Sequence, residues 1–169
     1  MKVILCDIDN CIADDEWRIP RINWQKTGDE RYHDYHLLSA WDKCVRFDIP
    51  DQALQERLED ESDKTVFMTA RPVSYRAMTE HWLIKQGFKK FELLMRPAGH
   101  RGTSPEVKQQ LLDWLTGGEY GISVQDIVHA FDDHQGVIDM YARNGIPATR
   151  VAIHNTSAFH DPIRNIAAA

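Results

Sequence analysis

Two pairs of aspartates follow apolar segments of the sequence, in positions where carboxylates could bind a metal or a substrate. Asp7 and Asp9 follow the run VILC, and Asp132 and Asp133 follow DIVHAF. Either pair by itself is more often a turn or a helix cap. Together, carboxylates at the ends of two apolar strands would repel one another unless a cation lay among them. Mg²⁺ prefers oxygen-rich sites with few protein ligands, so we predict a magnesium site at these aspartates.

Three further polar residues stand where they could contact an anion. Thr69 and Arg71 follow the apolar run VFM, and Lys108 lies in the first turn of a predicted helix. An acidic residue would be favoured there, because the helix dipole places positive charge at the N-terminus. A solvent-exposed lysine is the plain alternative, but a cation that faces a phosphate explains the position better.

The elements that would position these residues alternate along the chain. Short apolar segments predict strands at residues 2 to 8, 64 to 69, 90 to 95, 126 to 131 and 148 to 153. Helices are predicted at 72 to 88, 104 to 118 and 134 to 145. Pro72 suits a first helical position and Ser104 an N-cap. This alternation indicates an α/β fold, a doubly wound parallel sheet covered on both faces, in which ligands bind beyond the carboxyl ends of the strands.

The connection between the first two predicted strands is unusually long. It contains one predicted helix, at 50 to 61, and a dense set of aromatic residues at Trp17, Trp24, Tyr32, Tyr35, Trp41 and Phe47. A compact domain seldom carries an unstructured loop of this length, so we predict a single domain, 1 to 169, with a small cap inserted at about 14 to 62. The aromatic residues form either a satellite core or a platform on which bases stack.

The composition is that of an ordinary globular protein. No segment of the 169 residues approaches the roughly 20 apolar residues that span a membrane. The formal net charge of −6 disfavours a protein that covers duplex nucleic acid with Lys and Arg, but not one that grips a single phosphate or a strand end. An odd number of cysteines and no signal-peptide pattern predict reduced thiols and a cytoplasmic location. An oligomer is possible, because nothing in the sequence sets the oligomeric state.

Other reactive side chains are not expected to form the site. Cys6, Cys11 and Cys44 have no neighbouring base in the sequence, which disfavours a cysteine nucleophile. His33 and His36 have helical spacing and could bind a metal, yet no cysteine or third histidine is nearby. We expect them to be exposed residues of the cap.

Four motifs resemble, in order and spacing, those of the haloacid dehalogenase (HAD) superfamily of phosphatases. They are DIDNC at 7 to 11, Thr69 in VFMTAR, Lys108 in PEVK, and Asp132 and Asp133 in FDDHQG. The segments TARPVSYRAMTEHWLIKQGF, ELLMRPAG and FDDHQGVIDMYARNGI are, more narrowly, similar to the 3′-phosphatase domains of polynucleotide kinase/phosphatase enzymes. The similarity covers about residues 1 to 18 and 63 to 153.

This resemblance implies a Mg²⁺-dependent phosphomonoesterase that works through an aspartyl-phosphate. Asp7 would be the nucleophile and Asp9 the general acid and base, while Thr69 and Lys108 would hold the transferring phosphoryl group. The metal would be bound by Asp7, the Asp9 carbonyl and Asp132, with Asp133 completing its outer shell. Arg18 and Arg71 would bind the substrate phosphate or an adjacent one.

The implied substrate is the 3′-phosphate of a nucleotide or of a single-stranded nucleic acid end. A nucleoside 5′-monophosphate phosphatase is the first alternative, and a non-catalytic phosphoacceptor module is the second. Asn10 and Cys11 depart from the usual residues of the first motif, and Ser104 replaces the aspartate that the family commonly has four residues before the lysine. The chain has no GxxxxGK[ST] phosphate loop, so a kinase half is not expected in it.

Overall fold

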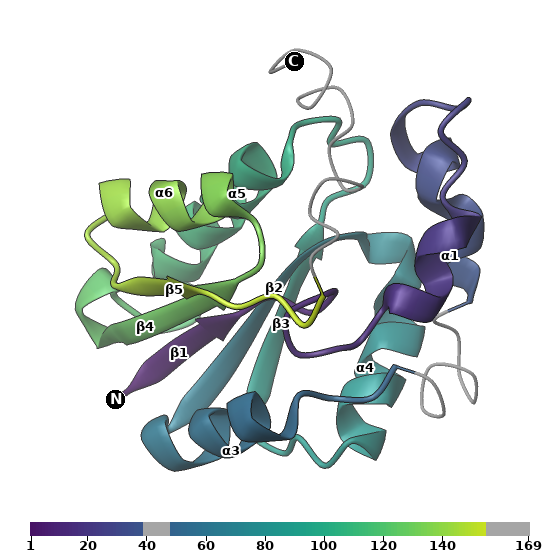
Figure 1. The fold of residues 1–169 in the computed structure, drawn as a ribbon. Coiled ribbons are helices and arrows are strands. Elements are labelled where there is room, and N and C mark those ends of the chain that lie inside the picture. Colours follow the sequence, from purple (N-terminus) through teal and green to yellow (C-terminus); the bar gives the residue numbers. More distant parts are fainter. Residues whose placement is uncertain (39–47, 155–169) are drawn as a thin grey trace.

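The computed structural model describes residues 1–38 and 48–154 (Figure 1). Its centre is a sheet of five parallel strands in the order β3-β2-β1-β4-β5. The strands are β1 (Val3–Cys6), β2 (Lys64–Pro72), β3 (Phe91–Arg96), β4 (Ile127–Asp132) and β5 (Ala148–Arg150). The described residues contain no helix long and apolar enough to cross a membrane.

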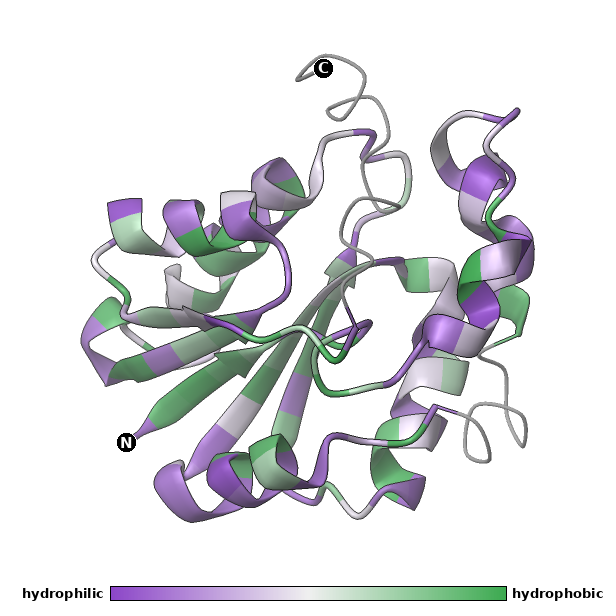
Figure 2. Cartoon of the chain, in the orientation of Figure 1, coloured by the Kyte–Doolittle hydropathy of each residue, from purple (hydrophilic) through white to green (hydrophobic). Residues whose placement is uncertain are grey.

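Helices cover both faces of the sheet and complete a three-layer α/β fold, as the alternating pattern predicts. On one face lie α3 (Gln52–Glu61) and α4 (Arg76–Lys85), and on the other lie α5 (Ser104–Thr116) and α6 (Gln135–Arg143). The central strand β1 is buried along its whole length and reads as hydrophobic in Figure 2. Its side chains alternate, so Val3 and Leu5 join the core under α5 and α6, while Ile4 and Cys6 join the core under α3 and α4.

Short helices from the long connection form a separate lobe at the right of Figure 1. They are the 3-10 helices η1 (Glu16–Arg21) and η2 (Gly28–Tyr32), and α1 (His33–Leu37). The lobe has its own small core of Ile19, Ile22 and Tyr35, with Tyr32 packed against it. Helix α3, although it belongs to the same connection, packs on the sheet instead, through Leu54 and Leu58. Trp41, Cys44 and Phe47 lie outside the described residues.

Three details of the predicted elements are corrected by the structure. Pro72 has extended backbone and ends β2, so a 3-10 turn, η3 (Val73–Tyr75), precedes α4. Thr103 rather than Ser104 is the N-cap of α5, because the Thr103 N–H donates to the Glu106 carboxylate at 2.7 Å in a capping box. Strand β5 stops at Arg150, three residues before the predicted end. The remaining short helix is η4 (Val124–Asp126).

Candidate active site

Three carboxylates and one lysine meet at the carboxyl ends of β1 and β4. Asp7 follows β1, Asp132 ends β4, and Asp133 is the next residue. One oxygen of each lies within 4.8 Å of the others, and all three residues are buried. Lys108 reaches them from α5, with its Nζ 2.7 Å from Asp7 Oδ1 and 2.5 Å from Asp132 Oδ2. The sequence motifs that carry these residues are therefore brought together.

The pKa values of this cluster reflect its burial and the closeness of its three carboxylates. Burial raises the pKa of Asp7 to about 7, although Lys108 opposes the shift. Burial, together with Asp7 and Asp132, also raises the pKa of Asp133 well above its usual range. Burial alone would lower the pKa of Lys108, but Asp132 and Asp7 hold it well above the ordinary value. A divalent cation among the carboxylates would relieve their repulsion, so the residues fit a metal such as Mg²⁺.

Asp9 lies in a different environment, between two arginines. Arg71 donates to it twice, from Nε to Oδ2 at 2.8 Å and from Nη2 to Oδ1 at 2.6 Å, and Arg18 Nη2 donates to Oδ1 at 2.6 Å. Burial alone would raise the pKa of Asp9, but the guanidinium groups of Arg71 and Arg18 hold it well below its usual range. Asp9 is therefore ionised at neutral pH, and the two aspartates of the first motif are shifted in opposite directions.

A second carboxylate, Asp48, completes the arginine cluster. Its two oxygens accept from Arg18 Nε at 3.0 Å and from Arg18 Nη2 at 2.8 Å, a bidentate ion pair. Asp48 is 1% exposed, and Arg18 is fully buried. Sequence reasoning missed Asp48, because nothing in its neighbourhood marks it and its partner lies 30 residues away. The only hint is Arg18 itself, since a buried arginine needs anionic partners.

Asn10 orients the loop that follows the first motif. It adopts a left-handed backbone conformation, with φ 57°, which asparagine tolerates better than most residues. Its Nδ2 donates to Asp133 Oδ2 at 3.2 Å and to the His154 carbonyl at 3.0 Å, while its Oδ1 accepts from the His154 N–H at 2.9 Å. Asn10 thus holds Asp133 and the chain beyond β5 in one network.

A cavity of about 680 Å³ opens over these groups. Its floor includes Asp7, Asp9, Thr69, Arg71, Lys108, Asp132 and Asp133. The Thr69 hydroxyl accepts from the Arg71 N–H at 3.1 Å, which fixes it at the end of the regular part of β2. Arg18 does not line this cavity, and its guanidinium is occupied by Asp9, Asp48 and the Tyr35 carbonyl. Of the two predicted phosphate-gripping arginines, only Arg71 faces the cavity.

The cavity walls carry aromatic and basic side chains. Tyr32, Tyr35 and His36 come from the lobe, and Arg31, Arg96 and Arg101 complete the rim. His36 is buried, which corrects the expectation that it is an exposed residue of the cap. It packs between Tyr35 and Tyr75, with ring centroids at 5.1 and 4.9 Å. Burial lowers the pKa of His36 to about 3, so the ring is neutral at neutral pH.

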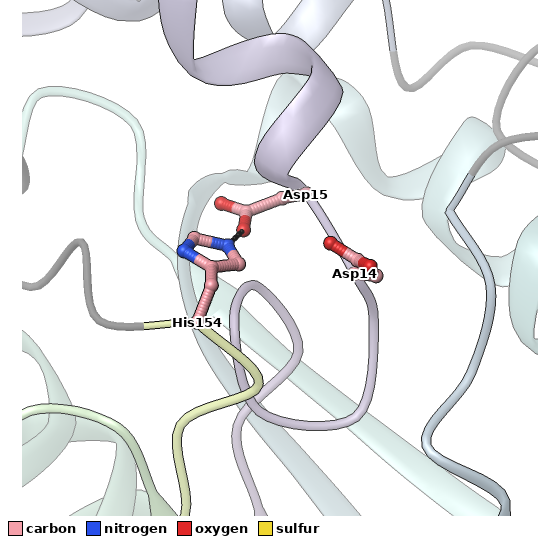
Figure 3. Close-up of side chains that lie close together, drawn as sticks. All are labelled: Asp14, Asp15 and His154. Atoms are coloured by element: carbon pink, nitrogen blue, oxygen red, sulfur yellow. Dashed lines mark hydrogen bonds and ion pairs between the residues drawn. The ribbon is translucent and has the colours of Figure 1, made fainter.

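A second group of potential ligands, Asp14, Asp15 and His154, lies outside this cavity (Figure 3). His154 Nε2 lies 2.5 Å from Asp15 Oδ1, and the Tyr35 hydroxyl donates to Asp15 Oδ2. Burial opposes protonation of His154, but the hydrogen bond and charge of Asp15 raise its pKa. Both oxygens of Asp15 are thus engaged by protein groups. The arrangement ties the chain beyond β5 to the loop after β1 through an ion pair.

A family model described as "Polynucleotide kinase PNKP phosphatase domain", of the HAD type, matches residues 1–155. The chain belongs to this family. It is a HAD phosphatase domain. No curated protein matches the sequence significantly.

Solved structures similar to this HAD phosphatase domain agree on the fold. A chain in the structure of the Pnkp1/Rnl/Hen1 RNA repair complex is 18% identical, with a TM-score of 0.60 over 90% of this chain. A second structure of the Pnkp1/Rnl/Hen1 complex gives 19% and 0.62 over 90%. The present chain spans only 43% and 46% of those two chains. A candidate phosphatase from Clostridium difficile is 15% identical, with a TM-score of 0.55, and is covered over 97% of its length.

Proposed function

We propose that this phosphatase domain removes the 3′-phosphate from a nucleotide or a nucleic acid strand end, with Mg²⁺ as its cofactor and Asp7 as its nucleophile. The observation that carries the proposal is the meeting of Asp7, Lys108 and Asp132 on the cavity floor, next to an Asp9 that two arginines orient. A nucleophile, a cation and a possible proton donor thus face the same space.

Asp7, Asp132 and Asp133 are the residues that would hold Mg²⁺, together with the carbonyl of Asp9. When bound, the ion would neutralise the carboxylates and the phosphate charge, which keeps Asp7 ionised and able to attack. The raised pKa values of Asp7 and Asp133 support this assignment, because burial and then the neighbouring carboxylates disfavour their charged forms, and a bound cation would offset both effects.

The chain's own residues would divide the reaction into two steps. An oxygen of Asp7 attacks phosphorus, the bond to the leaving oxygen breaks, and that oxygen takes a proton from Asp9. Water then attacks the aspartyl-phosphate and gives a proton to Asp9, which releases phosphate and restores Asp7. Lys108 and the Thr69 hydroxyl hold the phosphoryl oxygens throughout. Asp9 is ionised without substrate, so it must gain its proton as a phosphate dianion arrives and raises its pKa.

The substrate class is supported by the family and by the cavity walls. The matching family is described as the phosphatase domain of a polynucleotide kinase, and one of the similar structures is an RNA repair complex. Tyr32, which is only partly buried, offers an aromatic ring for a base, and Arg31 and Arg101 offer charges for a neighbouring phosphate. The net charge of −6 favours short or single-stranded ends over long duplex, since few phosphates would be neutralised on binding.

Phosphate release from a panel of substrates tests the proposal. The panel contains a short oligonucleotide 3′-phosphate, its 5′-phosphate isomer, and 3′- and 5′-mononucleotides, each with Mg²⁺. We expect the highest kcat/KM on the oligonucleotide 3′-phosphate, slower turnover of the 3′-mononucleotide, and only a weak dependence on salt. Asp7→Asn is the control, and it should abolish turnover of every substrate without unfolding the protein.

The panel also separates the alternatives. Fastest turnover of 5′-mononucleotides, with the oligonucleotide 3′-phosphate untouched, would replace the proposal with a nucleotidase. Formation of a stable phosphoprotein without phosphate release would point to a phosphoacceptor module. Unchanged activity of Asp7→Asn would show that the nucleophile is assigned wrongly.

A further inference from the structure

We infer that Asp48 is a positioning residue for the reaction, which acts through Arg18 to hold the carboxyl group of Asp9 in place. The inference rests on the proposed role of Asp9 as proton donor. Asp48 itself does not line the cavity, so it has no path to the substrate. Its effect must be transmitted by the side chain that it contacts.

The contacts of Arg18 show how this transmission works. One edge of its guanidinium is bound by both oxygens of Asp48, at 3.0 and 2.8 Å, and Nη2 continues to Asp9 Oδ1 at 2.6 Å. The ring of Tyr35 lies against the guanidinium, 4.3 Å from its central carbon. Arg18 is fully buried and thus has no room for another orientation. Asp48 therefore sets the angle from which Arg18 reaches Asp9.

The charges of the cluster give a second reason. Arg18 and Arg71 both bind Asp9, and Arg71 Nη2 also lies 3.8 Å from Asp48 Oδ2. With Asp48 the group has two cations and two anions in a buried space, whereas without it two cations would share one carboxylate. The surplus cation would have to move toward solvent or toward another anion, because an unpaired buried charge is costly. Either movement would release Asp9 from its present orientation.

Two tryptophans also hold Asp48 in position by hydrogen bonds. Trp17 Nε1 donates to Asp48 Oδ1 at 2.5 Å, and Trp82 Nε1 donates to the Asp48 carbonyl at 2.9 Å. Trp82 belongs to α4 and to the core under the sheet. Asp48 is thus anchored to α4, which packs on the sheet, and not only to the lobe.

The test compares leaving groups in Asp48→Asn, which keeps the shape of the side chain and removes its charge. A misplaced proton donor should matter most when the leaving oxygen needs a proton. We expect kcat on an alkyl phosphate to fall about 10- to 100-fold, kcat on p-nitrophenyl phosphate to fall less than about threefold, and KM to change little for both. Equal losses on the two substrates would overturn the inference, because a general loss of structure acts on both.

Two further variants isolate the path through Arg18. Arg18→Met should show the same dependence on the leaving group, and adding Asp48→Asn to it should cause no further change in the ratio of the two rates. This comparison also decides the question if Asp48→Asn alone does not fold, since the double variant removes both members of the buried pair. A further change of the ratio in the double variant would mean that Asp48 acts by another path.

Matched controls separate the inference from the proposed function. Asp15→Asn alters another fully buried carboxylate of the same region (Figure 3), and it should lower the melting temperature without changing the ratio of the two rates. A changed ratio there would overturn the special role of Asp48.

Asp9→Asn should show the largest dependence on the leaving group. If it shows none, the proposed role of Asp9 fails, whereas a normal Asp9→Asn result with an unchanged ratio in Asp48→Asn rejects the inference alone.

Discussion

Lys108 shows at the scale of one residue how a cation can be required at a helix start. Its ammonium group lies between Asp7 and Asp132, and it is 2% exposed. Burying a lysine costs desolvation of its charge, and here the two carboxylates offset that cost. Lys108 is therefore not a solvent-exposed surface lysine. We propose that the same ammonium group holds a phosphoryl oxygen when a substrate arrives.

We expect Lys108→Ala to lower kcat/KM by at least about 100-fold, the typical cost of losing one preorganised group that stabilises transition-state charge. Lys89→Ala is the control, because Lys89 is exposed and lies outside the cavity lining. It should change kcat/KM by less than about twofold, as surface substitutions usually do. Phosphate release from p-nitrophenyl phosphate measures both variants, and similar small effects would return Lys108 to a structural role.

The buried His36 should make the stability of the fold depend on pH in the acid range. Burial, with the positive charges of Arg71 and Arg18 adding to it, lowers its pKa to about 3, from the ordinary 6.5 that it regains on unfolding. Between these values the unfolded chain binds a proton that the folded chain does not, so stability is lost as the pH falls from about 6.5 toward about 3. His36→Gln, which cannot titrate, should reduce this loss.

Urea unfolding of the parent and of His36→Gln at pH 7 and pH 4.5 measures the effect. His33→Gln is the matched control, because His33 lies on the same short helix α1 but is exposed. The difference in unfolding free energy between the two pH values should be smaller in His36→Gln than in the other two proteins. Identical differences in all of them would show that His36 is already charged in the fold.

At the scale of elements, α3 illustrates how one long connection serves two parts of the fold. Asp51 caps the helix by accepting from the Leu54 N–H at 2.9 Å, and Leu58 is 1% exposed in the core with Ile4 and Phe67. The segment before α3 instead builds the lobe with its own small core. The helix packs on the sheet, and none of its residues lines the cavity.

Leu58→Ala should therefore destabilise the protein by about 2–5 kcal/mol, the range for truncating a buried leucine. The kcat/KM of the folded fraction should stay close to that of the parent, since Leu58 does not line the cavity. Ile84→Ala, at a position that is 62% exposed on α4, should cost less than about 0.5 kcal/mol. Equal effects of the two changes, measured by urea unfolding, would contradict the packing of α3 on the sheet.

At the scale of the whole molecule, the proposed metal site would couple folding to metal binding. Asp7, Asp132 and Asp133 converge only when β1 and β4 are paired, so the unfolded chain lacks the site. A ligand that binds only the folded state stabilises it, by about 2.7 kcal/mol at 100 times its dissociation constant. We expect Mg²⁺ to raise the melting temperature and EDTA to abolish activity.

The control is NaCl at equal ionic strength, together with Asp132→Asn, which removes one charge from the site. Both should show a much smaller rise in melting temperature than the parent with Mg²⁺. Activity that persists in EDTA, or that Zn²⁺ restores and Mg²⁺ does not, would contradict a magnesium site.

Much of the fold follows from local patterns in the chain. Near-continuous apolar runs such as VILC are what a strand needs when both faces of its sheet are covered, and β1 is buried at every position. Glycines and asparagine end the helices where expected, with Gly117 after α5 and Asn144 after α6. The exact helix starts were less predictable, because Thr103 and Ser104 are both good N-caps and the capping box with Glu106 selects between them.

The same physics explains which part of the site the sequence by itself determined. Asp7 follows β1, Asp132 ends β4 and Thr69 lies in the last part of β2. The carboxyl ends of parallel strands share one edge, so their meeting could be expected from the sequence. No such rule predicts the positions of Asp48 and His36. Their burial next to Arg18 and Tyr75 depends on how the lobe folds over the sheet, and no periodic pattern links residues 18 and 48 along the chain. Only the tertiary structure decided that Arg18 would bind Asp9 and Asp48 rather than face the cavity, because a buried charge takes whichever anion the packing brings within reach.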